Sequence, residues 1–264
     1  MIEEIVPETV CAADVQVASH TQSGLGDSLH LFPEEEKRMA RALARRRREF
    51  AEVRMCAHRA LAALGRTPVP LLPDERGATL WPAGITGSMT HCAGYRAAAL
   101  ARRADVASLG IDAERDGPLG EGTAEVVALP VELRHLRELS RARPVVHWDR
   151  LLFSAKESVY KAWSPFAGGR SLGFHDAHIE FHPGPGPGPG PGDADSELGP
   201  GKGTFTARLR APRGPVPGTL RGAWLARDGL LLTAVTVPAD ALSPRGTPPR
   251  GAGPTPGRCA PGGR

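Results

Sequence analysis

Two of the four lysines in this sequence lie within one short stretch, residues 153–163, and they flank a glutamate. The remaining basic residues are almost all arginines, so Lys156 and Lys161 are an unusual choice beside Glu157. A lysine ammonium is a compact, mobile point charge that suits a phosphate oxygen or a proton transfer. The alternative is an ordinary Glu-to-Lys pair on a helix surface, worth only about 0.2–0.5 kcal/mol.

A second set of chemical groups lies in residues 110–114, which read GIDAE. Alternate side chains of a strand share a face, so Asp112 and Glu114 are predicted to point the same way. Two neighbouring carboxylates repel each other unless a cation or a proton intervenes. Magnesium commonly takes a few protein carboxylates and fills its other positions with phosphate oxygens and water. The alternative is a solvent-exposed strand end.

Two further segments suggest anion binding. Residues 84–92 are rich in small and hydroxyl side chains, so we expect a loop whose backbone amides can approach an anion, with His91 beside it. His91 is equally compatible with a structural role. Residues 45–48 are four consecutive arginines, followed by Arg54 on the same expected helix. They form either a phosphate-binding patch or a solvated helix face.

The elements that must position these groups follow from periodicity and turn residues. Pro33 and the acidic residues after it predict the start of one long helix, whose apolar stripe runs to a stop at Gly65. Asp228-Gly229 predicts a hairpin between two strands. Two more helices are expected at residues 130–141 and 145–161. Strands are expected at residues 15–17, 95–101, 106–114, 172–174, 177–181, 204–209, 222–226 and 230–237.

Composition sets the class of protein. The chain has 264 residues, of which 41% are hydrophobic, enough for a core, and its net charge of +4 weakly favours anionic partners. Four scattered cysteines form no CxxC pair, which argues against a zinc module or a disulfide framework. Without a signal sequence or a long apolar segment, we expect a soluble, cytoplasmic protein. The cysteines are Cys11, Cys56, Cys92 and Cys259.

Three motifs in order, GSMTHCAGYRAA, GIDAE and HWDRLLFSAKESVYKAW, resemble the 4'-phosphopantetheinyl transferases of the monomeric enterobactin and surfactin synthetase-activating type. The resemblance covers about residues 30–238 and is strongest to actinobacterial members. It implies an α+β pseudo-two-fold fold of two similar halves, each a small antiparallel sheet with a long helix. We expect halves at residues 1–110 and 111–240, a Pro-Gly insertion at 183–203, and a disordered tail at 241–264.

The resemblance also implies an activity: magnesium-dependent transfer of the phosphopantetheine arm of coenzyme A to a serine of an acyl or peptidyl carrier protein, with release of adenosine 3',5'-bisphosphate. Such carriers serve fatty-acid, polyketide or nonribosomal peptide pathways. Their acidic surroundings lead us to expect a basic, partly apolar rim on this enzyme, which should act as a monomer.

Site residues are carried over position by position. Asp112, Glu114 and Glu157 match the magnesium ligands, Lys156 and Lys161 match lysines near the diphosphate, and Thr90 with His91 match a diphosphate contact. Arg46 and Arg54 match arginines that hold the 3'-phosphate, and Arg76-Gly77 match the adenine and ribose side. The chain has Pro73 where related enzymes often carry a lysine before that turn.

The resemblance assigns catalytic roles to Glu157, Lys161 and Asp112. Glu157 is our preferred acceptor of the serine proton, directly or through a metal-bound water, and Lys161 is a donor to the leaving phosphate, while Glu132 is a less favoured base. One alternative function is a metal-dependent nucleotide diphosphate hydrolase. A second is a basic nucleic-acid-binding module, supported only by the arginine run and lacking interleaved aromatic residues.

Overall fold

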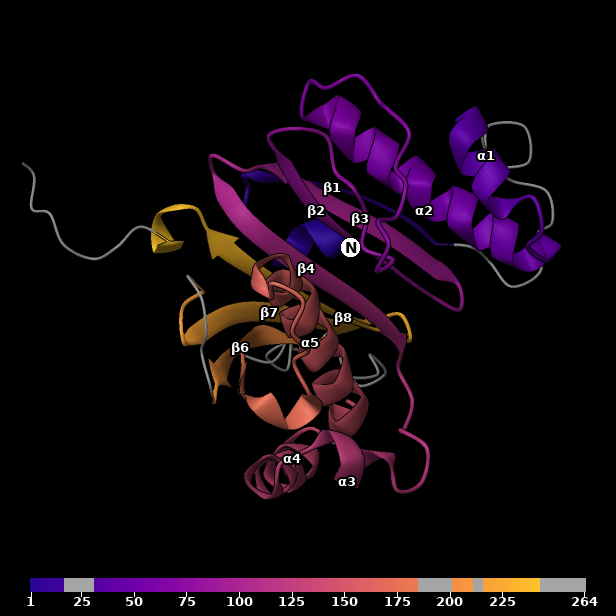
Figure 1. Cartoon of the computed structure of the whole chain (residues 1–264). Helices are drawn as coiled ribbons and strands as arrows, with labels where there is room; N and C mark the ends of the chain where they lie inside the picture. Colours follow the sequence, from indigo (N-terminus) through magenta and orange to yellow (C-terminus); the bar gives the residue numbers. More distant parts are fainter. Residues whose placement is uncertain (17–30, 185–200, 211–215, 243–264) are drawn as a thin grey trace, which may run out of the picture.

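The protein contains two antiparallel sheets (Figure 1). The structure is a computed structural model, which describes residues 1–16, 31–184, 201–210 and 216–242. The first sheet has three strands in the order β1-β3-β2, and the second has five in the order β4-β8-β7-β6-β5. The strands are β1 (Val10–Gln16), β2 (Ile85–Cys92), β3 (Tyr95–Arg102), β4 (Val106–Arg115), β5 (Ala177–Pro183), β6 (Gly201–Leu209), β7 (Thr219–Arg227) and β8 (Leu230–Pro238).

Each sheet packs against one long helix. Helix α2 (Ala44–Ala63) lies on β1 and β3, whereas α5 (Trp148–Trp163) lies on β4 and β8 (Figure 1). This arrangement confirms the predicted α+β fold of two halves, each an antiparallel sheet with a long helix. The smaller helices are α1 (Pro33–Met39), α3 (Thr123–Val127), α4 (Pro130–Ala142) and the single 3₁₀ turns η1 (Ile2–Ile5), η2 (Ser164–Phe166), η3 (Phe174–Asp176) and η4 (Asp240–Leu242).

The predicted single helix from Pro33 to Gly65 is wrong, because the chain leaves the helical path between α1 and α2. Leu43 has extended backbone angles at the start of α2 and is 82% exposed, so it does not continue an apolar stripe. Helix α1 is held instead by Glu35, whose buried carboxylate accepts hydrogen bonds from the backbone N–H of Phe32 and of Leu71. That anchor turns α1 away from the axis of α2.

The loop predicted at residues 84–92 is also wrong, since residues 85–92 form strand β2. The hydroxyl of Ser88 accepts a hydrogen bond from the Ile111 amide at 3.1 Å, and that of Thr90 accepts one from the Ala113 amide at 3.1 Å. Both amides belong to β4, an edge strand of the five-stranded sheet. The small hydroxyl residues therefore join the two halves of the protein through side chains.

The opposite edge of the same sheet, β5, is covered by α4. The carboxylate of Glu132 accepts a hydrogen bond from the Ile179 amide at 2.7 Å, and the His135 ring lies 3.2 Å from the carbonyl oxygen of Phe181. Polar side chains thus satisfy backbone groups that a sixth strand would otherwise bind.

Other expectations have mixed outcomes. The Asp228-Gly229 hairpin is confirmed, and both residues have positive φ. Residues 172–174 are not a strand, because they lead into the turn η3. Strand β1 begins at Val10, earlier than expected. Most of the Pro-Gly insertion (185–200), most of the tail (243–264), Val17 and Cys259 lie outside the described residues.

The domain limits remain a prediction, although the change of sheet between β3 and β4 falls close to the expected boundary at residue 110. No helix in the described part of the chain is both long enough and apolar enough to cross a membrane.

Candidate active site

Strand β4 and helix α5 lie unusually close together, and Gly110 makes this possible. A Cβ atom at Gly110 would collide with the carbonyl oxygen of Ser158 and come within 2.6 Å of the Ala162 amide nitrogen. Only a residue without a side chain allows the two backbones to approach in this way. The contact brings the α5 residues Glu157 and Lys161 to the strand that carries Asp112.

Asp112 is the central group of the site. One carboxylate oxygen, Oδ1, accepts a hydrogen bond from Lys161 Nζ at 2.7 Å and another from the Thr90 hydroxyl at 3.3 Å. Lys161 also donates to the carbonyl oxygen of Ile111 at 3.1 Å, which fixes its ammonium. The other oxygen, Oδ2, is buried and has no hydrogen-bond partner among the residues that the structure describes.

Glu114 and Glu157 are half-buried carboxylates near Asp112. Burial raises the pKa of both, and the negative charge of Asp112 raises each pKa further. Arg150 lowers the pKa of Glu114, because its guanidinium lies 3.2 Å from the carboxylate, and Lys161 lowers the pKa of Glu157. In both glutamates the raising effects are larger. Three carboxylates therefore share a poorly solvated region in which their mutual repulsion disfavours full ionisation.

This donor set fits a hard divalent cation by its chemistry. An orphaned carboxylate oxygen and two acids with raised pKa values are relieved when a cation provides the missing positive charge. The side chains are not, however, already gathered around one point. Within the described ranges, no three His, Cys, Asp or Glu side chains form a ready-made metal cluster. In this arrangement Asp112 is bound to Lys161, and Glu114 to Arg150.

Lys156, predicted to contact a diphosphate, points away from these groups. Its ammonium is buried and donates to the Glu132 carboxylate at 2.8 Å and to the carbonyl oxygens of Val127 at 2.9 Å and Phe174 at 2.7 Å. All three N–H donors are therefore used, so this geometry contradicts the predicted contact. Glu132 also accepts hydrogen bonds from the Leu129 and Ile179 amides, which removes it as a candidate base.

A cavity of about 110 Å³ opens next to the carboxylates, between α2 and β2. It brings together four of the predicted residues from distant parts of the sequence. Its full lining is Arg46, Glu49, Phe50, Val53, Arg54, Met89, Thr90 and His91. Arg46 lies 3.4 Å from the ring of His91. Partial burial and the positive charge of Arg96 lower the pKa of His91, so its ring is neutral at pH 7.

Arg54 is a buried cation in this cavity. Its guanidinium stacks 3.6 Å from the ring centre of Phe50 and donates a long hydrogen bond to the Leu71 carbonyl at 3.4 Å. Burial lowers its pKa to about 10, although the charge persists at pH 7. Its Nε is buried and has no partner in the described part of the chain. A guanidinium that lines a cavity and keeps its charge is suited to hold an anion.

The remaining predictions have different outcomes. Thr90 lines the cavity, but its hydroxyl is engaged by Asp112 and by the Ala113 amide. Arg76 and Gly77 form a turn organised by Asp74, whose carboxylate accepts the Arg76 amide, and Gly77 has a φ of 85°. Neither residue belongs to the described lining of the cavity. The Arg76 guanidinium instead lies beside Gly169, beyond the end of α5.

Sequence reasoning missed Arg150, the partner of Glu114. A signal was present, because Arg150 precedes Glu157 by seven residues and therefore lies two turns away on the same face of α5. It also missed the role of Ser88 at the junction with β4, because that contact depends on how the two sheets meet.

Comparison with known proteins agrees with this geometry. A model of the 4'-phosphopantetheinyl transferase N-terminal domain matches residues 34–101, and a model of the 4'-phosphopantetheinyl transferase superfamily matches residues 108–197. The chain is 51% identical over 216 residues to 4'-phosphopantetheinyl transferase Svp of Streptomyces mobaraensis, covering 80% of each chain. It is 42% identical over 240 residues to Npt of Nocardia iowensis, covering 89% of this chain and 99% of Npt. For PptT of Mycobacterium tuberculosis the identity is 43% over 211 residues, with 78% and 86% covered.

Proposed function

Since the chain belongs to the 4'-phosphopantetheinyl transferase family, we propose that it moves the 4'-phosphopantetheine arm of coenzyme A onto a serine of an apo carrier protein and releases adenosine 3',5'-bisphosphate. One observation supports this proposal independently of family membership. The contact between Asp112 and Lys161 lies beside a cavity that holds the buried cation Arg54. A diphosphate with a distant phosphate group matches that distribution of charge.

We assign the magnesium ion of this reaction to Asp112, Glu114 and Glu157. The support is chemical: Oδ2 of Asp112 is orphaned among the described residues, and the pKa values of the two glutamates are raised. When bound, magnesium would neutralise and orient the diphosphate oxygens. Glu114 would have to turn from Arg150 toward the other two carboxylates.

The side chains divide the work of the transfer. Lys161 holds its ammonium against Asp112, where it can stabilise charge on a diphosphate oxygen and donate a proton to the leaving phosphate. Glu157 lies one helical turn before it, and its raised pKa makes it a better proton acceptor for the carrier serine than an ordinary glutamate. Neutral His91 supplies a hydrogen bond to the diphosphate.

The basic cavity is assigned to the adenosine side of coenzyme A. Arg54 and Arg46 line this cavity, and in our proposal they hold the 3'-phosphate through charge-assisted hydrogen bonds. Lys156 is left out of the binding site, because its donors are used within the protein.

We further propose that the enzyme works as a cytoplasmic monomer. One chain supplies both the carboxylates and the cavity, so a second copy is not needed to complete the site. The three described cysteines, Cys11, Cys56 and Cys92, are free thiols, as expected in a reducing compartment.

The test is mass spectrometry of an apo carrier protein incubated with the enzyme, coenzyme A and magnesium. Addition of one phosphopantetheine arm, together with one adenosine bisphosphate per carrier, supports the transferase. Release of adenosine bisphosphate without the adduct would instead identify a nucleotide diphosphate hydrolase. Panels of carriers from fatty-acid, polyketide and nonribosomal peptide systems would then define the substrate range.

A further inference from the structure

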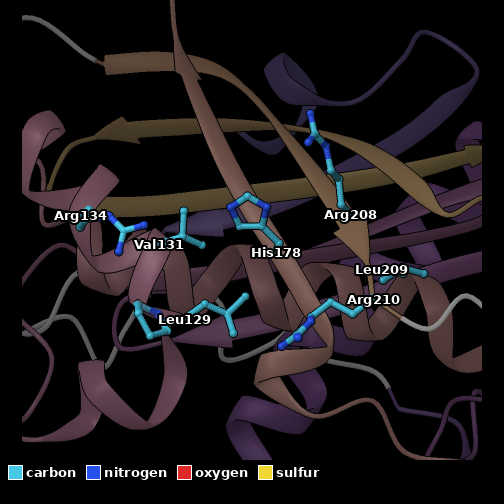
Figure 2. A pocket seen from close by; sticks show the side chains of 8 residues that line it. Leu129, Val131, Arg134, His178, Arg208, Leu209 and Arg210 are labelled. Carbon is cyan, nitrogen blue, oxygen red and sulfur yellow. The ribbon is translucent and has the colours of Figure 1, made fainter.

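The arginine assigned to the 3'-phosphate is buried, unlike the arginines that line a larger pocket elsewhere. That pocket, of about 500 Å³, lies at the start of α4, and its arginines, Arg134, Arg208 and Arg210, are all exposed (Figure 2). Water can solvate exposed guanidinium groups, so they need no partner within the protein. Arg54, in contrast, is only 9% exposed. A buried cation is costly unless the protein compensates its charge and fixes its position.

Glu35 of α1 supplies a buried negative charge beside α2. Its carboxylate is fully buried, and it accepts the Phe32 amide at 3.0 Å and the Leu71 amide at 2.9 Å. The ring of His58, on α2, lies 3.4 Å from the same carboxylate. Burial opposes ionisation, but His58 and the two amides together hold the pKa of Glu35 below the ordinary 4.5. Glu35 is therefore an anion at pH 7.

Leu71 connects this carboxylate to Arg54. It belongs to no helix or strand, and both polar groups of its backbone bind side chains. The Leu71 amide donates to Glu35, and the Leu71 carbonyl accepts a hydrogen bond from Arg54 Nη2 at 3.4 Å. The place of that carbonyl therefore depends on the contact with Glu35.

The charge of Glu35 also acts on Arg54 directly. Burial lowers the pKa of Arg54 to about 10, and the negative charge of Glu35 limits this fall. On its other side, the Arg54 guanidinium lies 3.6 Å from the ring centre of Phe50. Glu35 does not belong to the described lining of the cavity, whereas Arg54 and Phe50 do. Glu35 is thus placed to hold Arg54 without contacting a ligand.

We propose that Glu35 is a positioning residue of the coenzyme A site, which fixes the Leu71 peptide and, through its carbonyl, the Arg54 guanidinium in the cavity wall. The inference rests on the proposed function, since it concerns the arginine assigned to the 3'-phosphate. It makes the preference for coenzyme A over dephospho-coenzyme A, which lacks that phosphate, depend on α1. This helix contributes no residue to the described lining of the cavity.

Calorimetry with both ligands in the presence of magnesium tests the proposal. Glu35→Gln keeps the size of the side chain but leaves one acceptor oxygen for two amides. It should weaken coenzyme A binding by about tenfold, the range expected from a disturbed hydrogen bond to a charged group, and change dephospho-coenzyme A binding much less. The matched control is Glu36→Gln, the next residue of α1, which is exposed and should alter neither affinity.

A double-mutant cycle separates positioning of Arg54 from a general weakening of the fold. If Glu35 acts through Arg54, then adding Glu35→Gln to Arg54→Met should cause little further loss of coenzyme A affinity. Losses that multiply in the double variant would overturn the proposal, and so would equal losses for the two ligands. Tighter binding of coenzyme A by Glu35→Gln would also overturn it, because the charge would then only repel the bound anion.

Glu35→Asp provides a second variant should Glu35→Gln fail to fold, as judged by circular dichroism. It retains the negative charge but withdraws the carboxylate by one methylene, so a positioning role again predicts a selective loss of coenzyme A affinity. Wild-type selectivity in a folded Glu35 variant rejects the positioning role, and transfer to a carrier by the wild type then leaves the transferase assignment intact. Absence of transfer to every apo carrier tested rejects the proposed function itself.

Discussion

Asp112 presents one carboxylate oxygen to the Lys161 ammonium at 2.7 Å, while its second oxygen is buried without a partner in the described part of the chain. The two residues come from different elements, β4 and α5, and they meet because Gly110 lets those backbones approach closely. Because one oxygen of this buried carboxylate has no partner among the described residues, the ion pair contributes little to stability. The carboxylate is, however, well suited as a ligand for a cation.

Asp112→Asn should therefore reduce transfer by about 10²–10³-fold at ordinary magnesium concentrations, a loss typical of removing one preorganised charged group. The amide keeps an oxygen for Lys161 and Thr90, so the fold should persist. Transfer is measured by mass spectrometry of the carrier, and folding by circular dichroism. Asp105→Asn, at an exposed turn between β3 and β4, is the control and should leave activity unchanged. A fully active Asp112→Asn enzyme would reject the assigned metal site.

Magnesium should raise the melting temperature more at about pH 8 than at about pH 5.5, because metal binding needs deprotonated ligands. The pKa values of Glu114 and Glu157 are raised above the ordinary 4.5, so both retain protons at a pH where a free glutamate has lost them. Without metal, a raised carboxyl pKa stabilises the folded state at low pH, and this contribution is lost as the pH rises through that value. Thermal melts across pH with and without magnesium give the comparison. The same magnesium shift in Asp112→Asn would contradict the prediction.

Lys156→Met should destabilise the protein by about 3–5 kcal/mol, because it leaves the buried carboxylate of Glu132 without its cation. Urea unfolding measures the free energy of unfolding. Adding Glu132→Gln to Lys156→Met should restore much of the stability, since no unpaired charge then remains buried. Lys161→Met is the matched comparison: it should lose transfer activity, and because the Lys161–Asp112 pair is less buried than the Lys156–Glu132 pair, it should lose less stability. A stable Lys156→Met protein with weakened coenzyme A binding would restore Lys156 to the diphosphate site.

Arg54→Met should weaken coenzyme A binding by about 10–100-fold, the range expected from hydrogen bonds to a charged group. The methionine can still pack on Phe50, so the folded state should remain intact. Calorimetry with coenzyme A and with dephospho-coenzyme A, which lacks the 3'-phosphate, isolates the contact. The variant and the wild type should bind dephospho-coenzyme A equally well, and Arg59→Met, on the exposed face of α2, should change neither affinity. Equal losses for both ligands would place the 3'-phosphate elsewhere.

Features encoded by local sequence could be predicted. Periodicity predicted a helix at residues 145–161, and α5 forms there with Val159, Ala162 and Trp163 buried on one face. Strand alternation correctly placed Asp112 within β4, and Asp228-Gly229 marked a hairpin because a tight turn with positive φ strongly restricts residue choice.

Features set by contacts between distant segments could not be predicted. Strand β2 pairs with β3 along its whole length, and the hydroxyls of Ser88 and Thr90 also bind amides of β4. The glycine and serine of this segment concealed its strand character in the sequence. The direction of Lys156 depends on where α4 packs, which no spacing within residues 153–163 reveals. The break before α2 has neither glycine nor proline, and it follows from the anchor that Glu35 makes with the distant residue Leu71.

The side chains that cover β5 also protect the protein from self-association. Glu132 and His135 occupy the edge of this strand in place of another strand, so detachment of α4 would uncover free backbone amides and carbonyls beside an apolar core. A second molecule in the same condition could pair with that edge. Loosening of a single helix, well short of complete unfolding, is therefore sufficient to start self-association of the chain.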